Sequence, residues 1–68
     1  MKFIDRNDGA IYRVCKMGGA YKAARMRPED DRYLFVSSRY LPWRMEKTEA
    51  EADLLNFAIN RNLKRLED

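Results

Sequence analysis

Apolar residues in the last third of the chain recur at intervals of three and four positions, the spacing of one face of an α-helix. Residues 48–66 contain neither Gly nor Pro, and Thr48 followed by Glu51 fits a capping box at the start of a helix. We therefore predict one amphipathic helix over residues 48–66, with a buried face that needs a partner surface. That face comprises Leu55, Ala58, Ile59, Leu63 and Leu66, with Ala52 and Leu54 at its margins and Phe57 on the opposite side.

The first half of the chain instead carries short runs of β-branched and aromatic residues that are separated by turn-forming residues. Asn7–Asp8–Gly9 and Gly18–Gly19 are the turn signals, because glycine accepts the positive φ that tight turns require. The strands expected within residues 2–36 lie at 3–4, 10–16, 21–26 and 33–36.

Residues 37–47 are predicted to form an irregular linker, since Pro42 does not fit a central strand. The predicted class is therefore α+β: a small antiparallel sheet of three to four strands packed against one C-terminal helix. We expect a single small domain over residues 1–68, because a chain of this length has room for one core.

A two-residue loop at Gly18–Gly19 determines which residues oppose one another and share a face of the sheet. The expected pairs are Lys16 with Tyr21, Val14 with Ala23, Tyr12 with Arg25, Arg25 with Leu34 and Ala23 with Val36. One face then holds Tyr12, Val14, Tyr21, Ala23, Leu34 and Val36. The other face holds Ile11, Arg13, Cys15, Lys22, Ala24, Met26, Tyr33 and Phe35, together with Phe3. Because a desolvated central charge is unfavourable, the helix is predicted to cover the first face.

Several functional classes conflict with the composition. The chain has no histidine and one cysteine, which excludes histidine-based triads, cysteine–histidine zinc sites and a disulfide framework. The first eight residues carry four charges without an apolar run, and no segment reaches the ~18 apolar residues of a membrane span. We expect a cytoplasmic protein that is not an enzyme and has no cofactor, metal site or membrane partner.

Charge is distributed unevenly along the chain. The net charge is +3, but residues 1–45 hold ten Lys or Arg against five Asp or Glu, whereas residues 46–68 hold four against six. The predicted sheet region is therefore basic and the helix region slightly acidic. This excess is either an ordinary solvated surface or a face that attracts polyanions.

Aromatic rings among cations on the second face suit stacking on bases and neutralisation of phosphates. Alternatives stay open: segment 40–43 folds over that face and buries the rings, or a second copy covers it. Trp43 is correspondingly a stacking element, an interface anchor or a plug of the core.

The predicted function is a small non-enzymatic protein that binds nucleic acid in an accessory or regulatory role. The alternative is a protein-interaction module, an inhibitor or adaptor that binds another chain or itself through Phe57, Trp43, Tyr33 or Phe35. Arginine pairs well with phosphate and stacks on rings, which guides the choice of binding residues. The candidates for nucleic-acid binding are Arg13, Lys22, Arg25, Arg27, Arg32, Tyr33, Arg39 and Arg44.

Three successive predicted strands contain Tyr12–Arg13–Val14, then Gly19–Ala20–Tyr21 with Ala24–Arg25, then Arg32–Tyr33–Leu34; Thr48, Glu51–Ala52 and Ala58 follow in the helix. In this order the residues resemble the Apetala-type (ethylene-response) DNA-binding domain over about residues 11–63. The chain differs from that family in its longer segment 37–47 and in Val36, where the family has Gly. The resemblance implies a sheet that lies in the major groove of DNA, with Arg13, Lys22, Arg25, Arg27 and Arg32 near phosphates or base edges.

Overall fold

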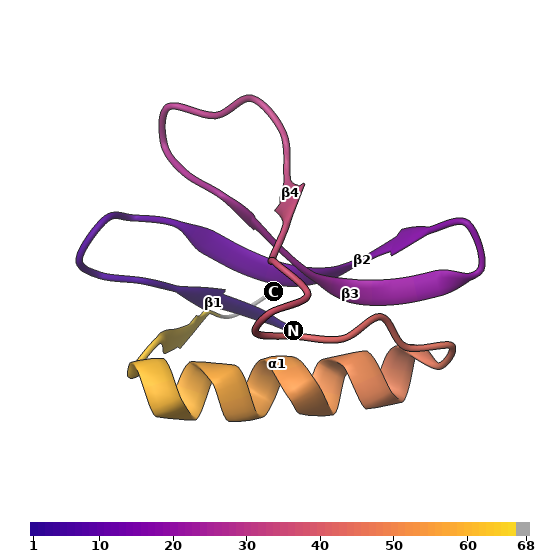
Figure 1. Ribbon diagram of the computed structural model, residues 1–68. Helices are drawn as coiled ribbons and strands as arrows, with labels where there is room; N and C mark the ends of the chain where they lie inside the picture. Colours follow the sequence, from indigo (N-terminus) through magenta and orange to yellow (C-terminus); the bar gives the residue numbers. More distant parts are fainter. Residues whose placement is uncertain (67–68) are drawn as a thin grey trace.

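The computed structural model describes residues 1–66, which form a five-stranded antiparallel sheet with one helix across one of its faces (Figure 1). The elements in chain order are β1 (Lys2–Ile4), β2 (Ile11–Met17), β3 (Ala20–Met26), β4 (Leu34–Phe35), α1 (Lys47–Arg61) and β5 (Lys64–Leu66). The strands lie in the order β4-β3-β2-β1-β5, and each neighbouring pair is antiparallel. The predicted α+β class is confirmed, with one more strand than expected.

The register of the central strands follows the glycine hairpin, as predicted. Gly18 has a φ of 61° in the loop between β2 and β3. The N–H of Val36 donates to the carbonyl of Ala23 at 3.0 Å, which extends the β3–β4 pairing past the end of β4. The pairs Lys16 with Tyr21, Val14 with Ala23, Tyr12 with Arg25 and Arg25 with Leu34 are all present.

The core lies between the sheet and α1. On its sheet side, Tyr12, Ala23 and Val36 are buried, as the predicted face requires. Leu34 remains 46% exposed because β4 is the edge strand. The predicted position of Phe3 on the face of Arg13 and Lys22 is wrong. Phe3 pairs with Tyr12, which places it in the core on the helix side of the sheet.

Helix α1 presents a different face to the sheet from the one predicted. Ala50, Leu54 and Ala58 are its buried residues. Leu55 and Ile59, which were expected in the core, expose 38% and 66% of their surface. Of the other predicted core residues, Leu63 packs partly against the core, after the end of the helix.

The packing of a helix ring on a sheet ring accounts for this rotation of α1. Phe57, predicted on the side of the helix opposite its core face, packs on Tyr12 with ring centroids 5.6 Å apart. Beside two large rings, dense packing leaves room for small side chains on the buried face of the helix, and Ala50 and Ala58 are buried there.

Helix α1 also ends five residues before its predicted end. Asn62 has left-handed backbone angles (φ 59°, ψ 38°), and its N–H donates to the carbonyl of Ile59 at 3.3 Å. Residues 64–66 then pair with the edge of β1 that β2 leaves free. This pairing gives hydrogen-bond partners to backbone groups of β1 that would otherwise lack them in the sheet. The helical periodicity of residues 48–66 does not indicate that the last residues pair with a strand instead of continuing the helix.

The predicted capping box at the start of α1 is wrong. Glu46 occupies the N-cap position with extended backbone, and its side chain makes no capping hydrogen bond. Thr48 lies one residue inside the helix. Glu49 in the first turn and Arg61 in the last turn still agree with the helix dipole.

The linker between β4 and α1 runs beside the sheet toward the start of the helix (Figure 1). It is irregular, as predicted, but it is anchored at two positions. Leu41 is buried in the core, and Arg44 exchanges two backbone hydrogen bonds with Tyr21, of 2.7 and 2.8 Å. These anchors fix the path of the residues around Trp43.

Candidate nucleic-acid interface

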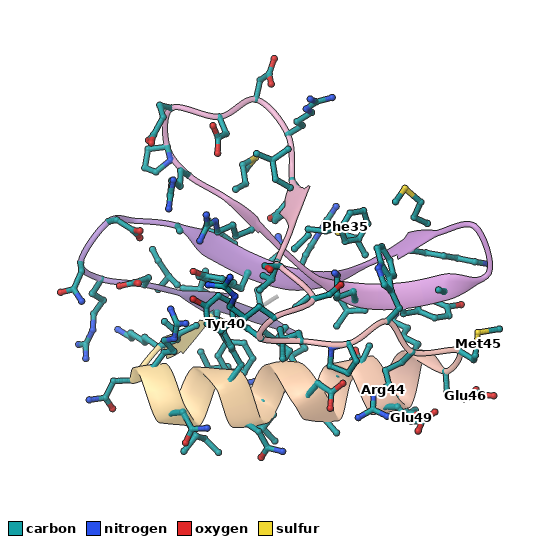
Figure 2. All side chains as sticks on the ribbon, viewed as in Figure 1. Phe35, Tyr40, Arg44, Met45, Glu46 and Glu49 are labelled. Carbon is teal, nitrogen blue, oxygen red and sulfur yellow. The ribbon has the colours of Figure 1, made fainter. Side chains whose placement is uncertain are left out.

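We call the face of the sheet opposite α1 the open face. Alternation along the strands places Arg13 and Lys22 on it, because their neighbours Tyr12 and Ala23 face the helix. Phe35 projects from the sheet on this side, away from α1 (Figure 2). The open face therefore combines cations with aromatic rings, as the sequence indicates.

Trp43 is stacked on this face. Its ring lies on Phe35 with centroids 4.7 Å apart and planes tilted by 53°. The ammonium of Lys22 is 4.5 Å from the centre of the indole and donates to the hydroxyl of Ser38 at 2.9 Å. Lys22 is consequently buried (4% exposed), whereas Trp43 retains 38% of its surface. The indole is the exposed ring of this cluster, since Phe35 is half-buried.

This arrangement decides between the alternatives for Trp43 and the linker. Trp43 does not plug the core, where Leu41 is buried instead. The linker does fold over part of the open face, since Trp43 covers Phe35 and Lys22. The linker covers the ring of Phe35 but exposes the ring of Trp43, so aromatic surface remains available to a ligand.

Arg13 and Tyr33 form a second pair of a cation and a ring. The guanidinium carbon of Arg13 lies 4.4 Å from the centre of the Tyr33 ring. Arg13 is exposed and Tyr33 is half-buried. A guanidinium that stacks on a ring keeps its N–H groups free at its edge, where they can reach phosphate oxygens.

The strands concentrate positive charge. Among residues 1–66, the five strands contain no Asp or Glu, because the acidic side chains lie in the turns, the linker and α1. An anion that approaches the sheet therefore meets cations without interspersed acids. The cations on the strands are Lys2, Arg13, Lys16, Lys22, Arg25, Lys64 and Arg65.

The structure does not bring all eight predicted binding residues to one surface. Arg13, Lys22 and Tyr33 belong to the open face, but Arg25 opposes Tyr12 and lies on the helix side. Arg27 is 3.9 Å from a carboxylate oxygen of Asp8. Arg32 and Arg39 are exposed, in the β3–β4 connection and in the linker respectively.

Arg44 is engaged by the helix. Its Nε and Nη2 donate to the two carboxylate oxygens of Asp53 at 2.8 and 3.2 Å, and Glu49 lies 3.9 Å away. Figure 2 shows Arg44 beside Glu49 at the start of α1. The hydrogen bond and the negative charge of Asp53 raise the pKa of Arg44, and Glu49 adds to this effect. The charge of Arg44 thus joins the linker to α1.

Arg61 lies outside the predicted set. Its guanidinium carbon is 4.6 Å from the centre of the Phe57 ring and 5.3 Å from that of Tyr40. The spacing of four residues between Phe57 and Arg61 places them on one side of a helix, which is a signal present in the sequence. The proximity of Tyr40 follows from the path of the linker and has no local signal.

Three further features of residues 1–66 concern thiols, metal ligands and membrane spans. Cys15 is a half-buried thiol in β2. Residues 1–66 contain no group of three or more Cys, Asp or Glu side chains placed to hold a metal ion. In the same part of the chain, no helix has the length and apolar character needed to cross a membrane.

Comparison of the chain with protein-family models, with curated proteins and with solved structures finds no match.

Proposed function

We propose that the chain binds single-stranded nucleic acid on the open face of its sheet. The observation that carries this proposal is the pairing of each accessible ring with a cation on a face whose strands have no acid. Trp43 lies over Lys22, and Tyr33 lies beneath Arg13, at 4.5 and 4.4 Å. Single strands are recognised by rings that stack on bases and by cations that follow the backbone.

Trp43 is the stacking platform in this proposal. Phe35 supports the indole from within the sheet, and the buried ammonium of Lys22 fixes its position through Ser38. A base can stack on the exposed part of a ring that is already held in place, so little side-chain entropy is lost on binding.

Arg13 is the phosphate contact. The guanidinium is exposed and oriented by Tyr33, so its N–H edge can donate to two phosphate oxygens at once. Arg32 is an exposed cation in the connection that ends at Tyr33, so it extends the basic surface beyond the strands.

Single strands are favoured over a duplex because Trp43 retains exposed surface on which an unpaired base can stack. Bases inside a duplex are stacked on one another and are not accessible to such rings, whereas unpaired bases are. The resemblance to the Apetala-type domain implies a duplex on the same sheet, so both forms belong in the test.

The test is a titration of a labelled 15-nucleotide single strand and of the matching duplex, followed by fluorescence anisotropy at ~50 and ~200 mM salt. We expect saturable binding of the single strand that weakens steeply with salt, because each neutralised phosphate releases counterions. Trp43 is the only tryptophan, so its fluorescence reports base stacking directly. Binding of the duplex alone would replace the single-strand proposal with the major-groove mode.

Two substitutions and one control define the surface. Trp43→Ala is expected to weaken binding about tenfold or more, the loss of one stacked base, and Arg13→Gln is expected to reduce the salt dependence. Arg6→Gln is the matched control, because it removes the same charge from an exposed turn between β1 and β2 that belongs to neither the open-face cluster nor the pocket lining. Equal losses in all three variants would mean that net charge alone drives binding.

The outward side of α1 favours a second candidate function, self-association. Ala52, Leu55 and Ile59 are exposed and follow one another at intervals of three and four, the spacing of a coiled-coil seam. In a twofold antiparallel pair of helices, the large Ile59 of each copy meets the small Ala52 of the other, with Leu55 near the axis. This interface replaces the one expected at Phe57, which is packed on Tyr12.

Light scattering across a range of protein concentrations tests this candidate. A dimer that Ile59→Glu converts to a monomer would support it. Met17→Glu is the matched control, because Met17 is 57% exposed on the hairpin and lies outside the seam. A wild-type monomer throughout the range would remove the candidate.

A further inference from the structure

A pocket of about 290 Å³ lies on the helix side of the sheet, where the linker, β3 and the end of α1 meet. Tyr40, one of its lining residues, is between the sheet and α1 in Figure 2. Arg25 comes from β3, Ser37 from the linker, and Phe57 and Arg61 from α1. Phe35 of the edge strand β4 also lines the pocket, so the pocket reaches the edge of the open face. Its two arginines are not among the residues of the proposed single-strand site, and this inference does not depend on the proposed function.

Two guanidinium groups line the pocket, and no acidic residue among residues 1–66 lines it with them. Within the same residues, neither Arg25 nor Arg61 has an ion pair with a carboxylate. Arg25 is half-buried beside the core residue Tyr12. Two positive charges around one partly desolvated space are unfavourable unless an anion neutralises them.

The rings around Arg61 hold it ready for such an anion. Phe57 and Tyr40 lie 4.6 and 5.3 Å from its guanidinium carbon, so their faces orient the planar group. The N–H edge is then the free part, and a planar guanidinium binds two oxygens of one phosphate at once. The end of α1 additionally favours a cation at this position.

The linker adds a hydroxyl group and an accessible ring. The hydroxyl oxygen of Ser37 accepts the backbone N–H of Arg39 at 3.1 Å, which leaves its own hydrogen free to donate. Tyr40 retains 55% of its surface, so a flat molecule can stack at the mouth of the pocket.

We propose that this pocket binds the phosphate monoester of a small aromatic molecule. The phosphate lies between Arg25 and Arg61, Ser37 donates to it, and the aromatic part rests on Tyr40. Two guanidinium groups prefer a doubly charged anion, so phosphate monoesters bind more tightly than carboxylates of the same shape.

The test uses phenyl phosphate as the probe, with inorganic phosphate and benzoate as comparisons. In a titration of ¹⁵N-labelled protein up to ~20 mM probe, we expect saturable shifts of the Ser37 and Tyr40 amides and of the Arg61 Nε–H. Phenyl phosphate should bind more tightly than either comparison. Equal binding by benzoate would overturn the preference for a phosphate, and the absence of saturation would overturn the site.

Protonation of the ligand gives an independent measure. A phosphate monoester loses its second proton near pH ~6, so binding should weaken between about pH 7.5 and about pH 5. The protein has no histidine to titrate in this interval. Unchanged affinity across it would overturn recognition of the dianion.

Arg61→Gln and Arg25→Gln should each weaken binding about tenfold, the loss of one charge-assisted contact. Arg61 is exposed, so its variant should keep the wild-type amide spectrum even if the Arg25 variant does not fold. Arg6→Gln is the matched control, because Arg6 is an exposed arginine between β1 and β2 that does not line the pocket, and the variant should bind phenyl phosphate as the wild type does. An equal loss in Arg6→Gln and Arg61→Gln would mean that net charge, and not the pocket, attracts the anion.

Discussion

Arg44 and Asp53 are joined by two hydrogen bonds, of 2.8 and 3.2 Å, that connect the linker to the first half of α1. Arg44 also pairs through its backbone with Tyr21 on β3. One residue therefore ties β3, the linker and the helix together, and it holds the chain next to Trp43 in place.

A double-mutant cycle tests this connection. Arg44→Gln and Asp53→Asn should each lower the Tm, and the double variant should lose little more than either, because both remove the same interaction. Salt at ~1 M should reduce the difference from the wild type, since Arg44 is partly exposed and its attraction to Asp53 is screened. Additive losses would mean that the two side chains act separately.

The pH dependence of the same pair follows from the raised pKa of Arg44. A group whose pKa is higher in the folded state stabilises that state at low pH, and the contribution is lost as the pH rises through the folded pKa. An arginine loses its proton only far above neutral pH. The contribution of Arg44 to stability should therefore stay constant between about pH 6 and about pH 9. Thermal melts of wild type and Arg44→Gln across this interval should keep a constant difference in Tm.

Leu54 and Leu55 offer a matched test of the helix orientation. Leu54 is fully buried, whereas Leu55 exposes 38% of its surface. Leu54→Ala should lower the free energy of unfolding by about 2–5 kcal/mol, the range for a truncated core leucine. Leu55→Ala should change it by less than ~0.5 kcal/mol, as surface substitutions do.

Urea unfolding at low protein concentration measures both variants while keeping any self-association through Leu55 out of the comparison. A larger loss in Leu55→Ala than in Leu54→Ala would contradict the orientation of α1.

Three glycines form a graded series of backbone tests. Gly19→Ala should be nearly neutral, because its φ is not positive and a Cβ would meet nothing within 4 Å. Gly18→Ala should cost about 1 kcal/mol from its φ of 61° alone. Gly9→Ala should cost more, since its φ is 76° and a Cβ would lie 3.0 Å from Cγ of Pro28. Thermal melts give the order directly, and any other order would contradict the turn geometries.

The parts of the fold that sequence predicts are those governed by local rules. Gly18–Gly19 dictates a two-residue hairpin, and strict alternation then carries the pairing from Tyr12 through Arg25 to Leu34. The proximity of Arg13 and Tyr33 on the open face follows from the same alternation. No tertiary information is needed for these steps.

The orientation of α1 depends on tertiary packing. Leu54 and Leu55 are adjacent and lie about 100° apart around the helix axis, so a rotation of that size exchanges their environments, and the periodicity fits either face. Phe57 selects one of them by packing on Tyr12, a contact between residues 45 positions apart in the chain. The contact between Arg61 and Tyr40 depends on the same rotation and therefore could not be predicted either.

The end of α1 gives the last prediction. Asn62 has a φ of 59°, a conformation that glycine adopts freely and that β-branched residues resist. Asn62→Gly should keep the Tm at or slightly above the wild-type value, whereas Asn62→Val should lower the free energy of unfolding by about 1–2 kcal/mol. Asn60→Val, two residues earlier and within the helix, is the control and should lose only the small difference in helix propensity. If Asn62→Val were as stable as the wild type, the helix would continue past residue 61, and residues 64–66 would no longer pair with β1. Hydrogen exchange of the Lys64–Leu66 amides distinguishes these states, because strand pairing with β1 protects them from exchange.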